Sequence, residues 1–129
     1  MSAFDSVSSL ALQHIWDGVH ARVLHGERLT LGVIELDANS VVPEHSHEHE
    51  QLGVCLSGTL VFRVGEESRE LQPGETWSIR GGVPHEVHVG RDGAVVLDVF
   101  APTRDDWRTA PKVDTRAPRW PGSDPGSSG

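Results

Sequence analysis

The chain has 129 residues, with 19 acidic and 11 basic side chains and a formal net charge of -8 at pH 7. This length suits one domain with its own core, and the negative charge excludes a phosphate backbone as the expected partner. We therefore do not expect a nucleic-acid-binding protein. No apolar stretch approaches the roughly 20 residues that span a bilayer, so we do not expect a membrane protein either.

The cysteine content and the N-terminus bear on the cellular compartment. Cys55 is the single cysteine, so no internal disulfide can form, and the first residues lack the basic patch and apolar run of a signal peptide. We therefore expect a cytoplasmic protein in which Cys55 is a buried, unreactive thiol.

Three regions follow one another along the chain. Residues 1–17 are rich in serine and show no strand period, which predicts a loosely ordered N-terminal arm. Residues 18–107 alternate short Val-, Leu- and Ile-rich segments with turn sequences roughly every 8 to 12 residues, which predicts an all-β sandwich or barrel. Residues 108–129 are dominated by Pro, Gly and Ser, which predicts a disordered tail or loose packing through Trp107 and Trp120. Strands are expected at 28–36, 51–56, 59–64, 68–71, 76–79, 86–89 and 94–100.

The stretch PEHSHEHEQ, residues 43–51, holds three histidines at alternate positions. Alternate side chains of an extended segment share a face, so His45 and His47 can converge on one ion. Gln51 can aim its amide oxygen at the same ion, and His85 follows a Gly-Gly-x-Pro turn that starts another strand. Three imidazoles and an amide oxygen suit a divalent transition metal. The alternative is a solvated acidic loop.

The other histidines are expected outside this site. His49 and the acidic residues around it are expected at its rim. Four more histidines are expected to be hydrogen-bonded surface groups: His14, His20, His25 and His88.

The last predicted strand carries a carboxylate, Asp98, within an apolar run and on the same face as Phe100. A buried carboxylate is normally paired or used in function. Two interpretations are open. Asp98 forms a structural ion pair with Arg104, or it is a general acid or base beside the metal while Arg104 binds a substrate carboxylate.

The two histidine segments resemble the paired motifs of the cupin superfamily. The first motif reads HxH, three or four residues, Glu, six residues, Gly, and it matches here at His45, His47, Gln51 and Gly58. The resemblance covers about residues 18–106. It implies a single cupin-type β-barrel, that is, a double-stranded β-helix of jelly-roll type.

The second motif reads Gly, five residues, Pro, x, Gly, two residues, His, three residues, Asn. It matches here at Gly74, Gly82 and His85. Three positions depart from the family pattern, since Gln51 replaces the Glu, Arg80 the Pro and Val89 the Asn.

The departure at Gln51 changes the chemistry expected of the site. A neutral amide leaves the charge of a divalent ion uncompensated, which favours Lewis-acid work over stabilising a higher oxidation state. Glu50 could act as a ligand only if the strand register slipped by one residue.

Within the superfamily, the chain resembles the KdgF-type cupins of pectin and alginate breakdown, which open the ring of 4,5-unsaturated uronate monosaccharides. The residues that carry this resemblance are Gln51, the segment VLDVF at 96–100 and the segment APTRDDW at 101–107. It implies a sugar acid as substrate and one divalent ion per chain, with Zn, Ni, Mn, Fe and Cu not distinguished. The implied metal ligands are His45, His47, Gln51 and His85, and the implied catalytic residues are Asp98, Phe100 and Arg104.

Two other functions are open at this point. Three histidine ligands also suit a cupin dioxygenase with iron or copper, and a cupin can bind a small acid without turnover. The resemblance to small single-domain cupins also implies a homodimer. The N-terminal arm with Trp16 could add a strand to the partner's sheet.

Overall fold

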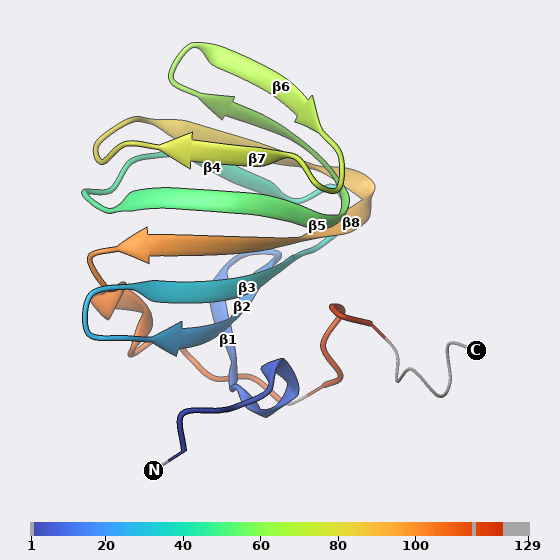
Figure 1. The fold of residues 1–129 in the computed structure, drawn as a ribbon. Coiled ribbons are helices and arrows are strands. Elements are labelled where there is room, and N and C mark those ends of the chain that lie inside the picture. The colour runs from blue at the N-terminus through green and yellow to red at the C-terminus, as the bar shows by residue number, and fades with distance from the viewer. Residues whose placement is uncertain (1, 115, 123–129) are drawn as a thin grey trace.

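The computed structural model describes residues 2–114 and 116–122, and strands make up most of that part of the chain (Figure 1). The strands are β1 Leu12–Trp16, β2 Val19–His25, β3 Thr30–Leu36, β4 Val41–His45, β5 Glu50–Val64, β6 Glu67–Leu71, β7 Thr76–Ile79 and β8 His85–Ala101. Two short 3-10 helices, η1 Val7–Ser9 and η2 Asp105–Trp107, flank them. Within the described ranges, no helix has the length and apolar character needed to cross a membrane. The prediction of a single all-β barrel is confirmed.

Two long strands, β5 and β8, pair antiparallel along their whole length and belong to both halves of the barrel. One half has the order β1-β2-β3-β8-β5-β7 and the other β4-β8-β5-β6. The β5–β8 ladder is interrupted between Cys55 and Ser57 and again between Gly58 and Leu60. Such bulges bend a strand and increase its twist, which lets β5 and β8 turn from one half into the other.

Glycines occupy the point where these two strands bend. Gly58 has φ +77° and Gly93 has φ +74°, the left-handed region that favours glycine. A Cβ atom on Gly58 would lie 2.0 Å from the carbonyl oxygen of Gly93, so no side chain fits between the two backbones.

The interior of the barrel is apolar because alternate residues of each strand point inward. The buried cluster includes Val19, Ala21, Ile34, Leu36, Leu60, Phe62, Ile79, Val87, Val89 and Val96. Three polar side chains, Gln51, His85 and Asp98, are buried on the same inward-facing positions. All three side chains line one cavity inside the barrel.

The strands differ in extent from the prediction. The segments 51–56 and 59–64 form the single strand β5, and 86–89 and 94–100 lie within β8. Turn-like glycines divided these strands in the sequence pattern, whereas the structure uses the same glycines as bends.

The N-terminal segment also differs from the predicted arm over 1–17. Residues 12–16 form β1, which pairs with β2 as Leu12 with Arg22 and His14 with His20. Polar residues on the outward face of both strands hid their alternation from the sequence pattern. Arg22 itself is fully buried, because the C-terminal segment covers that face.

The C-terminal segment, residues 108–114 and 116–122, bonds to residues of β1, β2 and β3 and does not form the predicted disordered tail. The His14 amide donates to the Pro111 carbonyl at 2.8 Å, and the Val113 amide donates to the Leu12 carbonyl at 2.9 Å. Residues 115 and 123–129 of the predicted tail lie outside the described residues. The segment covers the free edge of β1, so addition of that strand to a partner's sheet has no support here.

Candidate metal centre

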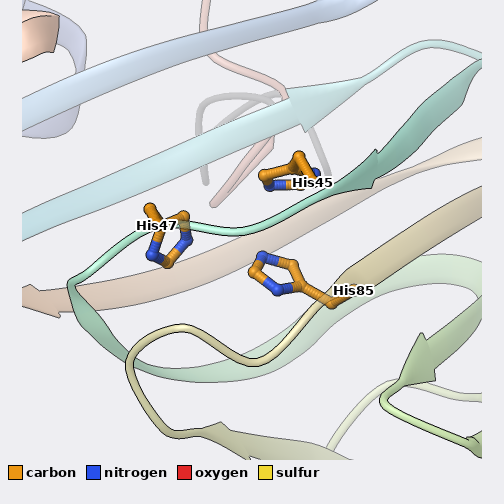
Figure 2. Close-up of side chains that lie close together, drawn as sticks. All are labelled: His45, His47 and His85. Carbon is orange, nitrogen blue, oxygen red and sulfur yellow. The ribbon is translucent and has the colours of Figure 1, made fainter.

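Three histidines converge at one end of the cavity (Figure 2). His45 ends β4, His47 lies in the loop before β5, and His85 begins β8. The β4–β8 ladder pairs His45 directly with His85, so strand pairing brings together residues forty positions apart. One ligand nitrogen from each ring lies within 4.8 Å of the other two. The interpretation of PEHSHEHEQ as a solvated loop is not supported.

Backbone carbonyls orient all three rings. The Nδ1 atoms of His45, His47 and His85 lie 2.9 to 3.0 Å from the carbonyl oxygens of Pro43, His49 and Val83, respectively. Because a carbonyl oxygen can only accept, each Nδ1 carries the proton and each Nε2 keeps a free lone pair. The Nε2 atom of His85 is buried and has no hydrogen-bond partner among the described residues. This is the arrangement that a metal ion completes.

Gln51 adds an oxygen to the same cluster. Its Oε1 atom lies 3.1 Å from Nε2 of His47. His47 already donates its Nδ1 proton, so a neutral ring brings two acceptor atoms face to face at this contact. A cation between them relieves the repulsion, and the residues present therefore fit a divalent transition metal.

The protonation of the rings favours the same interpretation. Burial lowers the pKa of His85 to about 4, and burial also lowers the pKa of His47. The charge of Arg104 lowers both pKa values further. Both rings are therefore neutral at pH 7, the form that binds metal without releasing a proton.

Asp98 is a buried carboxylate in the same cavity, with 4 % of its surface exposed. Burial raises its pKa to about 6, although hydrogen bonds from Trp77 and Gln51 and the charge of Arg104 act in the opposite direction. Trp77 Nε1 donates to Asp98 Oδ1 at 2.8 Å. Gln51 thus links Asp98 to the histidine cluster.

Arg104 is held by aromatic rings and by another carboxylate. Its guanidinium lies 4.6 Å from the ring centre of Phe100 and 4.2 Å from that of Trp107. It donates to both carboxylate oxygens of Asp106, at 3.1 and 2.9 Å. Among the described residues, Asp98 and Arg104 form no ion pair, so that structural interpretation of Asp98 is wrong.

A cavity of about 570 Å³ collects all of the predicted site residues. Those residues are His45, His47, Gln51, His85, Asp98, Phe100 and Arg104. Ile15 and Trp16 of β1 and residues 109–111 of the C-terminal segment also line it. Its volume is within the range of small-molecule sites.

Comparison with known proteins identifies the family. Residues 32–100, more than half of the chain, match the family model described as "Cupin domain", and they include all three clustered histidines. The chain belongs to the cupin family.

Two solved structures resemble this cupin in fold, and one further protein resembles it in sequence. KdgF from Halomonas sp. is 25% identical with a TM-score of 0.75, and the match covers 82% of this chain and 98% of that one. An RmlC-like cupin from Shewanella frigidimarina is 21% identical with a TM-score of 0.76, covering 82% and 96% of the two chains. An uncharacterised protein of Streptomyces coelicolor is 27% identical over 86 residues, which are 67% of this chain and 82% of that protein.

Other polar side chains predicted outside the metal cluster lie at its rim or on the surface. Gln51 is buried and Glu50 is exposed, so the register has not slipped and Glu50 points away from the cluster. His49 is half-buried and its Nε2 donates to the Thr103 carbonyl at 3.2 Å. His88 is exposed beside Glu86, as expected of a surface group.

Sequence reasoning missed two residues of this cupin site. Trp77, the donor to Asp98, alternates with the buried Ile79 in β7, and that alternation was the available signal. Asp106, the partner of Arg104, follows it by two residues in a charged turn that resembles any solvated loop.

Proposed function

We propose that this cupin is a metal-dependent enzyme of small sugar acids, and that its reaction is the ring opening of a 4,5-unsaturated uronate. The observation that supports this most is the shared cavity, in which Asp98, Phe100 and Arg104 face the three-histidine cluster. The resemblance of the sequence to KdgF-type cupins and the likeness to Halomonas KdgF add support.

The metal ligands in this proposal are His45, His47, Gln51 and His85, which would hold one divalent ion per chain. Such an ion supplies Lewis-acid polarisation of substrate oxygens. The neutral amide of Gln51 lowers the ion's charge less than a carboxylate would, which favours this role over redox chemistry. The carbonyl contacts of the three Nδ1 atoms fix the ligand orientation in advance.

Asp98 is the proposed proton carrier. Its carboxyl lines the cavity, and the hydrogen bond from Trp77 fixes its orientation there. A positioned carboxyl can take a proton from one substrate oxygen or carbon and return it to another. Burial of Asp98 limits the loss of that proton to bulk water.

Arg104 and Phe100 are the proposed substrate-binding residues. The guanidinium can bind a substrate carboxylate through two parallel hydrogen bonds. Phe100 lies beneath that guanidinium and borders the cavity, so its ring can pack against the sugar. Together the two residues would orient the substrate relative to Asp98.

The test follows the loss of the 4,5-double-bond absorbance of an unsaturated uronate with purified protein. D98N should lower the rate by about 100-fold or more while metal content stays at the wild-type level. R104A should raise KM, and Q51E should keep the metal and lower the rate. D105N, which removes an exposed carboxylate outside the cavity, is the control. Full activity in D98N would exclude proton transfer by Asp98.

The apolar wall of the cavity favours a second candidate, a cupin dioxygenase. The wall is formed by Ile34, Leu36, Leu60, Phe62, Val87 and Val96. Such a wall suits a less polar substrate than a uronate. Oxygen uptake by iron-loaded protein with a phenolic or diketone substrate would support this candidate, and ligand binding without turnover would indicate a binding module. The homodimer and the cytoplasmic location stay predictions.

A further inference from the structure

The guanidinium of Arg104 already carries a carboxylate at the cavity wall. Both oxygens of Asp106 accept from it, at 3.1 and 2.9 Å, in the two-bond geometry with which an arginine binds a ligand carboxylate. Arg104 and Asp106 both border the cavity. The position that an anionic substrate group needs is therefore taken by a side chain of the protein itself.

The two partners differ in how firmly they are held. Arg104 is 11 % exposed, lies over the rings of Phe100 and Trp107, and has its backbone amide bonded to Thr30 Oγ1 at 2.8 Å. Asp106 is 57 % exposed on the short helix η2. Asp106 is therefore the exposed partner of this pair, and Arg104 is the partner held by further contacts.

We propose that Asp106 is a specificity-determining residue whose carboxylate competes with the anionic group of the substrate for Arg104. A ligand carboxylate then binds by exchange, replacing two charge-assisted hydrogen bonds with two equivalent ones while Asp106 becomes hydrated. This inference rests on the role of Arg104 in the proposed function.

The exchange selects a chemical class of ligand. A planar carboxylate restores both hydrogen bonds to the guanidinium, whereas a neutral hydroxyl cannot match the charge of the Asp106 carboxylate that it displaces. The ligand class is therefore a small acid whose carboxylate reaches Arg104. Asp106 weakens the binding of this acid, because the ligand must first replace a partly exposed ion pair. The expected reduction in affinity is roughly fivefold.

Calorimetric titration of zinc-loaded protein with D-galacturonate, a saturated uronate, tests the exchange. D106N should bind galacturonate roughly fivefold more tightly than the wild type, and both should bind neutral D-galactose equally. D105N is the matched control, because Asp105 lies on the same helix, loses the same charge, and pairs with Arg108 outside the cavity lining. Its affinity should equal that of the wild type.

The outcomes separate this inference from the proposed function. Tighter galacturonate binding in D106N alone supports the exchange, even if no variant turns over an unsaturated uronate. Equal affinities in D106N and D105N, or weaker or absent binding in D106N, would overturn it and leave Asp106 as a support for Arg104. If the wild type is active and KM is unchanged in D106N, the proposed function stands and the exchange does not.

Discussion

Trp77 and Asp98 meet in a 2.8 Å hydrogen bond that crosses directly over Gly53. Gly53 of β5 pairs with Trp77 of β7 on one side and with Asp98 of β8 on the other. A Cβ atom on Gly53 would lie 2.1 Å from the indole nitrogen and 2.2 Å from Asp98 Oδ1. The absence of a side chain at this position is what allows donor and acceptor to meet.

Gly53→Ala should therefore separate Trp77 from Asp98. The added methyl group overlaps both atoms, and the displaced carboxylate loses its donor inside a buried site. We expect the free energy of unfolding to fall by about 3 kcal/mol, from overpacking together with the lost hydrogen bond. Urea unfolding at pH 7 measures this loss.

Gly32→Ala is the matched control for that variant. Gly32 of β3 lies opposite Asp98 on the other side of β8, and its added Cβ would lie 3.4 Å from the ring of Trp107, an ordinary contact. This control should change the free energy of unfolding by less than about 1 kcal/mol. Equal losses in the two variants would show that the Trp77–Asp98 contact is not what excludes a side chain at Gly53.

Replacing Asp98 by Asn should stabilise the metal-free protein at neutral pH. The pKa of Asp98 is about 6 in the fold and 3.8 ordinarily, so the folded protein binds this proton more tightly than the unfolded chain. The stabilisation from the proton is complete below pH 3.8 and is lost as pH rises through 6. The wild type therefore loses stability relative to D98N across that range.

Urea unfolding of the two proteins, after treatment with a chelator, measures this effect. The advantage of D98N should be about 2 kcal/mol larger at pH 7.5 than at pH 4, from the difference between the two pKa values. An advantage that stays constant between pH 4 and 7.5 would show that Asp98 does not titrate with a raised pKa.

The barrel and its cluster of three histidines could be predicted because both depend on local spacing. An alternating pattern places His45 and His47 on one side, and a turn followed by a strand places His85, so the residues that meet are each set by their own segment. The bends at Gly58 and Gly93 could not be predicted, because a positive φ inside a strand resembles a turn in the sequence.

Contacts between distant and irregular segments could not be predicted. The carboxylate of Glu35, a single charge in an apolar strand, binds Arg116 and Arg119 across more than eighty residues. No periodicity in the sequence links those positions. The described part of the C-terminal segment contacts the barrel through individual side chains and backbone groups, and it does so without a regular strand pairing. The same reason hid Asp106, whose partner is fixed by the stacking of Arg104 on aromatic rings.

The histidine cluster should bind one divalent ion per chain, and His85→Ala should abolish that binding. His85 is the buried member, with an unpartnered Nε2. Metal analysis of protein purified without a chelator or a nickel column measures the content. The bound ion should also raise Tm, and the chelator should reverse that increase.

Two further variants keep the metal test decisive. His45→Ala removes an exposed ligand with little effect on packing, so it separates loss of metal from misfolding. His88→Ala removes an exposed histidine three residues from His85 in the same strand and should leave metal content unchanged. Equal metal content in the His45, His85 and His88 variants would contradict the site.

The buried carboxylate of Glu35 should be essential to the attachment of the C-terminal segment. It pairs with Arg116 at 2.8 Å and Arg119 at 3.5 Å and lies 4.0 Å from the fully buried Arg22. Glu35→Gln leaves a buried guanidinium without its counter-charge, so we expect a loss of about 3 kcal/mol in urea unfolding. Glu67→Gln, in an exposed pair, should cost less than about 1 kcal/mol. Equal losses in both variants would show that burial adds nothing to the Glu35 pair.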